Sequence, residues 1–163
     1  MILTRRRVVQ GGGLMLAGLP LAALAAGDAV EIVMFGDERG ARVGFDPAGV
    51  LVRPGTTVTW RNADRGNAHT ATAFHPGNAG HQRRIPVAAR PWDSGYLLPD
   101  ETFAVRLTVA GVYDYFCTPH EMAGMVGRIV VAQGNFAPPA TAGMEEMFPP
   151  VEEIVRLGEV GAP

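Results

Sequence analysis

The sequence predicts an all-β protein, an antiparallel β-sandwich of seven to eight strands with a short C-terminal helix. From residue 30 to residue 132, short β-prone runs alternate with turn residues, and no convincing helix lies among them. Glycine (21 residues) and proline (13 residues) make up about a fifth of the chain, which favours turns and short strands. Hydrophobic residues amount to 47% and charged residues to 18%, enough apolar material for a core and too little charge for a disordered chain.

The first half of this region contains four predicted strands, each followed by a turn or loop signal. In the clearest of them, Thr56, Val58 and Trp60 alternate with Thr57 and Thr59, so one face is expected to be buried. The four predicted strands cover residues 31–35, 50–52, 56–60 and 69–74.

The second half contains three more predicted strands. In the strand predicted at 102–109, apolar residues at every second position indicate one buried face. The other two cover 112–117 and 127–132. Between the two halves, residues 75–100 carry four prolines and are predicted to be an irregular segment.

The last thirty residues, 134–163, differ in character from the sandwich. Pro138 and Pro139 indicate a linker, whereas Pro150 precedes a run with acidic residues in its first turn and Gly158 just past its end. Proline, acidic residues and glycine in these places are typical of a helix, so a short C-terminal helix is expected. The sequence leaves open whether this helix packs on the sandwich or docks to a partner protein.

The N-terminal 25 residues are interpreted as an export signal. Arg5, Arg6 and Arg7 are followed by an uncharged stretch, 8–26, which contains a small-residue cleavage pattern ending at Ala25. The paired arginines and the glycine-diluted apolar stretch resemble a twin-arginine signal, which predicts a periplasmic protein. The alternative is an uncleaved membrane anchor, which the glycines and Pro20 disfavour. Residues 28–133 then form the predicted folded domain.

Charge and cysteine content exclude two classes of protein. The net charge is −2, and all 14 basic residues are arginine, which argues against binding nucleic acid through its phosphates. Without residues 1–25 the chain has 11 arginines against 16 acidic residues and is mildly acidic. Cys117 is the single cysteine, so an internal disulfide scaffold is excluded.

The chemistry-bearing residues gather after the strand predicted at 112–117. Cys117, His120 and Met125 lie within nine residues, and His69 lies 48 residues upstream of Cys117. A thiolate, two imidazoles and a weak thioether together suit copper. Cu(I) prefers sulfur and Cu(II) prefers nitrogen, so a mixed set that favours neither state keeps the rearrangement on electron transfer small. The set leaves no obvious open position for a substrate, so an enzyme is not predicted.

The segment 113–127 carries the motif Tyr-x-Tyr-x-Cys-x-x-His-x-x-x-Gly-Met-x-Gly. This motif resembles the plastocyanin and pseudoazurin branch of the cupredoxins, the type 1 blue copper proteins, and the resemblance covers about residues 30–132. It implies a Greek-key β-sandwich with one type 1 copper per chain. It also implies an electron carrier, a monomer that passes single electrons between redox proteins such as a c-type cytochrome, an oxidase or a reductase.

Carried over residue by residue, the resemblance makes His69, Cys117 and His120 the three strong copper ligands and Met125 the weak axial ligand. The edge of His120 is expected to reach the surface through an apolar patch. The family often has asparagine after the first histidine, where this chain has Thr70. The Thr70 hydroxyl is expected to connect the two ligand loops in its place.

The remaining candidates near the site are assigned other roles. His75 and His81 are interpreted as solvated loop residues, with a secondary metal site or a docking role as the alternative. Met122 has the wrong spacing for the axial ligand and is expected on the apolar surface. Strand parity directs Tyr113 and Tyr115 inward and Asp114 and Phe116 outward. Phe116 is expected either to contact a partner or to be covered by the segment 75–100.

Three other functions remain open at this stage. The first is a periplasmic copper chaperone or storage protein, which would bind copper(I) without an intense blue colour on copper(II). The second is a small reductase or oxidase domain, which normally needs a second copper centre. The four histidines of this chain leave too few ligands for one. The third is a sandwich without a metal.

Overall fold

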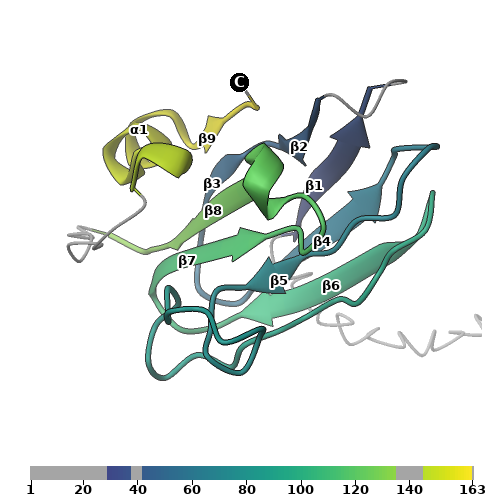
Figure 1. The fold of residues 1–163 in the computed structure, drawn as a ribbon. Coiled ribbons are helices and arrows are strands. Elements are labelled where there is room, and N and C mark those ends of the chain that lie inside the picture. The colour runs from purple at the N-terminus through teal and green to yellow at the C-terminus, as the bar shows by residue number, and fades with distance from the viewer. Residues whose placement is uncertain (1–28, 38–41, 135–144, 163) are drawn as a thin grey trace, which may run out of the picture.

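Two β-sheets pack face to face and a short helix covers part of one of them (Figure 1). The computed structural model describes residues 29–37, 42–134 and 145–162. The predicted export signal 1–25 and the proline pair of the predicted linker fall outside the described residues. The β-sandwich with a C-terminal helix is confirmed as the fold class.

The first sheet has four strands in the order β2-β1-β4-β6. β1 pairs with β4 in parallel, while the β1–β2 and β4–β6 pairs are antiparallel. The alternation predicted for 56–60 is confirmed, because Thr56, Val58 and Trp60 are buried and the residues between them are half-buried. The strand bounds are β1 Ala29–Gly36, β2 Val43–Asp46, β4 Thr56–Asn62 and β6 Thr102–Leu107.

The second sheet has five strands in the order β5-β7-β8-β3-β9. β3 pairs with β8 in parallel, and the β5–β7, β7–β8 and β3–β9 pairs are antiparallel. Both sheets are therefore mixed, with one parallel pair in each. The strand bounds are β3 Gly49–Val52, β5 Thr72–Ala73, β7 Gly111–Phe116, β8 Val126–Val131 and β9 Glu159–Val160.

Nine strands lie in the described ranges, where seven to eight were expected. The sequence pattern missed β2 and β9, because both are short and owe their conformation to pairing with β1 and β3. The strand predicted at 69–74 shrinks to the two residues of β5, since part of this run pairs with an irregular segment instead. His69 forms an isolated bridge with Leu97, and Thr72 forms one with Asp93.

The core between the sheets is aromatic at its centre. The Trp60 ring lies 5.2 Å from the Tyr115 ring and 5.6 Å from the Trp92 ring, measured between centroids. Cys117 and Met125 belong to the same buried cluster, so the predicted ligand loops extend directly from the core. Burial of such large apolar side chains is the main source of stability in a sandwich of this size.

The outer face of β7 is covered, contrary to the simplest expectation from strand parity. Every residue of β7 is buried. Phe116 packs against Phe74 and Phe148, and the His81 ring lies 4.6 Å from the Phe116 ring. The segment 75–100 therefore covers Phe116, which was one of the two expected outcomes, and the C-terminal tail contributes Phe148.

The C-terminal helix packs on the sandwich. Helix α1 spans Val151–Leu157, as predicted, with Pro150 at its start and Gly158 at its end. Its buried residues Val151 and Ile154 contact the outer face of β7 and β8, and β9 extends the sheet beside β3. No helix within the described part of the chain is long and apolar enough to cross a membrane.

Candidate metal centre

Two loops at one end of the sandwich bring the predicted ligands together. His69 lies on the loop that follows β4, and Cys117 directly follows β7. The chain then turns through His120 and a 3-10 turn, Glu121–Ala123, before it enters β8 after Met125. The Cys117 N–H donates to the Met125 carbonyl at 3.0 Å, and the His120 N–H donates to the Cys117 carbonyl at 2.9 Å. These hydrogen bonds close the second loop into a compact unit.

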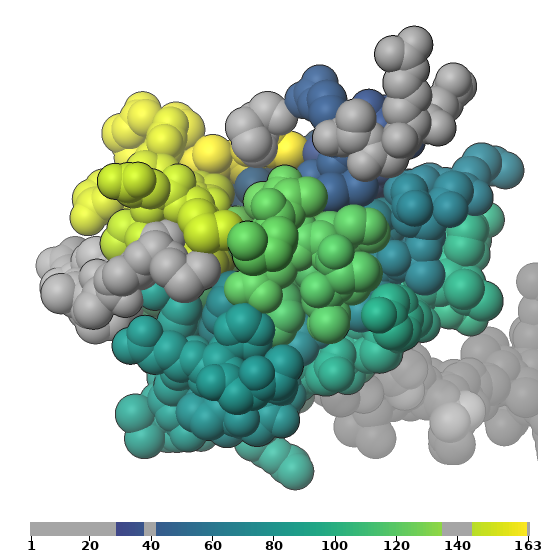
Figure 2. Space-filling view, in the orientation of Figure 1, coloured from purple at the N-terminus to yellow at the C-terminus, as the bar shows by residue number. Residues whose placement is uncertain are grey.

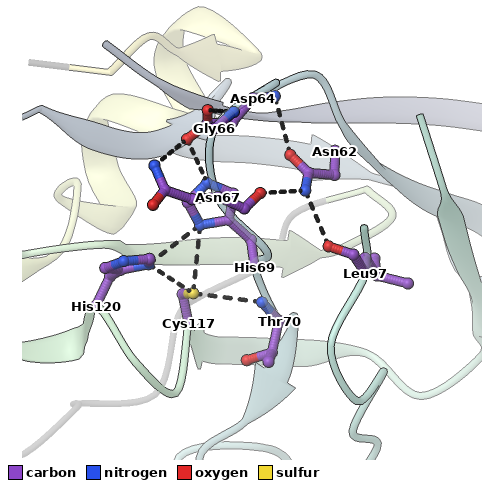
Figure 3. A network of polar contacts seen from close by, with 9 residues as sticks. All are labelled: Asn62, Asp64, Gly66, Asn67, His69, Thr70, Leu97, Cys117 and His120. Atoms are coloured by element: carbon purple, nitrogen blue, oxygen red, sulfur yellow. Dashed lines mark hydrogen bonds and ion pairs between the residues drawn. The ribbon is translucent and has the colours of Figure 1, made fainter. Parts of the chain in front are cut away.

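Three donor atoms converge on one point (Figure 3). The Nδ1 atoms of His69 and His120 lie 3.1 Å apart, and the Cys117 Sγ lies 3.6 Å and 3.4 Å from them. A point equidistant from all three lies about 2 Å from each, close to the usual length of a bond from a metal to nitrogen and slightly shorter than one to sulfur. The site therefore has the size that one metal ion in a trigonal plane requires.

Met125 lies beside this triangle in the core. Its side chain is fully buried, and it belongs to the same cluster as Cys117. A buried thioether near a thiolate and two imidazoles fits the weak axial position of a copper site. Its role as the fourth ligand stays a prediction.

The two imidazoles differ in exposure. His69 and Cys117 are fully buried, whereas His120 is half-buried and reaches the surface. The green segment in the middle of Figure 2 contains this loop, which therefore forms part of the molecular surface. Met122 is 97% exposed there, which confirms its place on the surface and excludes it as a ligand.

Thr70 connects the two ligand loops. Its N–H donates to the Cys117 Sγ at 3.3 Å, and its Oγ1 accepts from the Thr118 N–H at 2.8 Å. The expectation that the hydroxyl replaces the usual asparagine is confirmed. A hydrogen bond to the sulfur also withdraws electron density from it, which is one way in which a protein tunes a metal–thiolate bond.

The sequence does not predict the contact that Asp64 makes with His69. Its Oδ2 lies 3.0 Å from the Nε2 of His69, on the side of the ring opposite the donor triangle. Burial alone would raise the pKa of Asp64, but hydrogen bonds from Asn67, Gly66 and His69 outweigh it and lower the pKa to about 2. Asp64 stands among polar turn residues five positions before His69, so nothing in the local pattern separates it from an ordinary loop aspartate.

Burial also acts on the ligands themselves. It raises the pKa of the Cys117 thiol and lowers the pKa of the His69 imidazole, because a low-dielectric site disfavours charge. The uncharged thiol and imidazole are therefore favoured until a cation enters. A metal ion reverses this preference for the sulfur, since thiolate is the ligand form and its proton is released on binding.

The other two histidines stay outside the donor triangle. The Nδ1 of His75 accepts a hydrogen bond from the Gly77 N–H at 3.0 Å. His81 is not a solvated loop residue as expected, because its ring packs against Phe74 and Phe116 and its Nε2 lies 3.3 Å from the Glu121 carboxylate. Among the described residues, His69, Cys117 and His120 form the one cluster that could hold a metal.

Comparison with known proteins identifies the family. A profile described as copper binding proteins, plastocyanin/azurin family, matches residues 32–132. The chain belongs to this family. It is therefore a cupredoxin, the resemblance that the motif around Cys117 indicates, and its cofactor is copper, one type 1 ion per chain.

Two algal proteins and two solved structures illustrate the relationship. The chain is 35% identical over 130 residues to a chloroplastic plastocyanin of Tetradesmus obliquus, covering 77% of this chain and 81% of the relative. It is 34% identical over 137 residues to a chloroplastic plastocyanin of Chlamydomonas reinhardtii, covering 77% and 82%. A Sinorhizobium pseudoazurin is 28% identical with a TM-score of 0.50, covering 66% of this chain and 76% of that one. A pseudoazurin from Methylobacterium extorquens AM1, 22% identical with a TM-score of 0.54 and coverage of 80% and 96%, shares the fold.

Proposed function

We propose that this protein is a periplasmic carrier of single electrons whose copper is held by His69, Cys117, His120 and Met125. The observation that carries the proposal is the convergence of the Nδ1 atoms of His69 and His120 and the Sγ of Cys117, all within 3.6 Å of one another. The His120 ring is half-buried and reaches the surface. The plastocyanins and pseudoazurins that it resembles support the same function.

Bound copper supplies a one-electron couple between Cu(II) and Cu(I). The task of the chain is to keep the ligand cage still while the charge of the site changes. Cys117 is fixed by the Met125 carbonyl and the Thr70 N–H, and His69 is fixed by Asp64. Because these contacts join buried groups in a close-packed core, they resist movement of the donor atoms. A small rearrangement permits fast electron transfer.

His120 provides the route for the electron to the surface. The exposed residues beside it carry no charge: Thr118, Pro119, Met122, Ala123 and Gly124. The half-buried carboxylate of Glu121 is paired with His81. Such a surface suits brief contact with an apolar face of another redox protein, because a small interface without strong ion pairs dissociates readily. The partners proposed are a c-type cytochrome, an oxidase or a reductase.

The periplasmic location rests on the N-terminal sequence. Residues 1–25 carry the features of a twin-arginine signal, a route that exports folded proteins. N-terminal sequencing of the protein from a periplasmic fraction should begin close after Ala25. Replacement of Arg6 and Arg7 by lysine should leave the precursor in the cytoplasm.

The visible spectrum of the copper-loaded protein tests the function. One equivalent of Cu(II), added to the protein without residues 1–25, should give an intense blue band that one electron bleaches reversibly. Cys117→Ser should lose the band completely, because the band arises from charge transfer between sulfur and copper. The matched control Met122→Leu, at an exposed position in the same loop, should keep it.

Two outcomes would contradict the proposal. If Cys117→Ser remains blue, the ligand assignment is wrong. If the protein binds Cu(I) reversibly but gives no blue band with Cu(II), a copper chaperone or storage protein is the better interpretation.

A further inference from the structure

A buried carboxylate lies behind one of the two imidazoles. The Asp64 side chain is 4% exposed and the His69 side chain 0%, and the 3.0 Å contact joins Oδ2 to Nε2. A buried charge is costly unless it is paired and hydrogen-bonded. The position of Asp64 is therefore a specific feature of this site that needs an explanation.

The carboxylate is fixed in place by its neighbours (Figure 3). Its Oδ1 accepts from the Gly66 N–H at 2.8 Å, and its Oδ2 accepts from the Asn67 side-chain amide at 2.9 Å. The Asp64 N–H donates to the Asn62 side chain at 2.9 Å. Asn62 in turn donates to the Leu97 carbonyl, on the segment that bridges to His69. The carboxylate is thus part of a rigid frame.

The first sheet leaves room for this carboxylate only because β1 ends in glycine. A Cβ placed on Gly36 would lie 1.9 Å from the Asp64 Oδ2. Two heavy atoms cannot approach so closely, so any larger residue at Gly36 would displace the carboxylate. The strand end and the Asp64 side chain therefore fit together as a pair.

The contact fixes which nitrogen of His69 carries its proton. An ionised carboxylate can only accept hydrogen bonds, so Nε2 must be the donor. A neutral imidazole with its proton on Nε2 presents a lone pair on Nδ1. Nδ1 is the atom that faces Cys117 and His120. No partner for the Nε2 of His120 lies within the described ranges of the chain, so the two imidazoles are held differently.

We propose that Asp64 is a positioning residue that prepares His69 for copper and lowers the reduction potential of the site. The effect on the reduction potential rests on the proposed electron-carrier function, whereas the positioning of His69 does not. Asp64 holds the proton of His69 on Nε2, which leaves Nδ1 free to bind metal, and it does so even when no metal is present. Its negative charge, passed through a buried imidazole, favours the more positive, oxidised copper, because Coulomb interactions are strong where solvent is excluded.

The first test needs no copper. In the metal-free protein, nitrogen NMR at neutral pH should find the His69 proton on Nε2. In Asp64→Ala the two tautomers should become mixed, while the tautomer of His120 should remain as in the unaltered protein. A His69 proton on Nδ1 in the unaltered protein, or an unchanged His69 tautomer in Asp64→Ala, would overturn the positioning role.

The second test measures the reduction potential of the copper-loaded protein. Asp64→Asn keeps the shape of the side chain and removes its charge. It should shift the equilibrium toward reduced copper at least about tenfold, a rise of about 59 mV for one electron. The matched control Glu121→Gln removes the same charge beside His120 without a hydrogen bond to a ligand. Glu121 is paired with His81 instead, so this variant should give less than half of the Asp64→Asn shift.

A third variant displaces the carboxylate without removing it. Gly36→Ala should raise the potential in the same direction as Asp64→Asn, because the added methyl group occupies the place of Oδ2. An unchanged potential in Asp64→Asn, or an equal shift in Glu121→Gln, would overturn the effect on the potential. A protein that forms no blue site at all would instead contradict the proposed function and leave the tautomer result standing.

Discussion

The two faces of β7 are both buried, but by different means. On the inner face, Tyr113 and Tyr115 pack in the apolar core that leads to Cys117. On the outer face, Asp114 is fully buried and accepts hydrogen bonds from Arg84 and Arg128 at 2.7 to 3.0 Å. The inner face is thus stabilised by apolar packing, whereas the outer face combines the apolar contacts of Val112 and Phe116 with an enclosed ion-pair network.

The C-terminal tail completes the outer network. Glu145 lies 2.9 Å from both Arg84 and Arg128, and the Phe148 ring lies 4.9 Å from each guanidinium. Arg128 also donates to the Pro149 carbonyl at 3.2 Å. The strand that carries Cys117 is therefore fixed on one side by the core and on the other by the tail. The comparison teaches that the inner core contributes both stability and ligands, whereas the outer network contributes stability without a hydrogen bond to a predicted ligand among the described residues.

Asp114→Ala should disrupt the ion-pair network on the outer face of β7 and have the largest effect on stability of the variants considered. The substitution removes the fully buried carboxylate that both guanidiniums share and leaves them the partly exposed Glu145, and loss of one partner of a buried pair costs about 3–5 kcal/mol. Urea unfolding of the metal-free protein measures this loss. The blue band of the folded, copper-loaded variant should stay in place.

An exposed ion pair provides the control for this variant. Glu31 lies 3.0 Å from Arg61, and both side chains are at least a third exposed. Glu31→Ala should cost less than about 1 kcal/mol. A similar loss in the two variants would contradict the importance of the buried network.

Thr70→Val should have a smaller effect, confined to the metal-binding end of the inner face. It removes the acceptor of the Thr118 N–H while the side chain keeps its shape, which should cost about 1 kcal/mol. Calorimetry measures the stability, and the visible spectrum should show a shifted blue band, because the two ligand loops lose a connection.

Thr56→Val is the matched control for Thr70→Val. The Thr56 hydroxyl is buried and has no hydrogen-bond partner among the described residues, so its removal should be neutral or stabilising. If Thr56→Val destabilises the protein as much as Thr70→Val does, the hydrogen bond at Thr70 is not the cause.

The pH dependence of stability tests the inner face. Burial raises the pKa of Tyr113 to about 12. The unfolded chain therefore releases this proton first, near the ordinary value of 10. The contribution of Tyr113 is complete below pH 10 and is lost as the pH rises toward 12. Urea unfolding of the metal-free protein at pH 9, about one unit below this range, and at pH 11.5, near its upper end, should reveal the decrease. Tyr113→Phe should reduce the decrease, while Tyr96→Phe, at an exposed position, should leave it as it was.

Much of the site could be predicted because its signal is local. Cys117, His120 and Met125 lie within one loop, and the strand that leads to them has clear parity. His69 could be found because it follows the end of a well-defined strand. The C-terminal helix was visible from Pro150 and Gly158, which mark its ends.

The features that escaped prediction depend on residues far apart in the sequence. Asp114 lies 30 residues from Arg84 and 14 from Arg128, and no local pattern links them. Asp64 is the exception, because its partners Gly66, Asn67 and His69 are near in sequence but no pattern separates it from an ordinary loop aspartate. β9 exists only because β3 offers a free edge. Strand parity correctly placed Asp114 and Phe116 on the outer face, but it contains no information on what covers that face.

The most direct measurement is a crystal structure of the copper-loaded protein with anomalous diffraction at the copper edge. The account predicts one copper ion within bonding distance of the Nδ1 atoms of His69 and His120 and the Sγ of Cys117, with the Met125 sulfur at a longer distance. Copper bound elsewhere, or copper that contacts His120 and Cys117 while His69 has moved away, would contradict it.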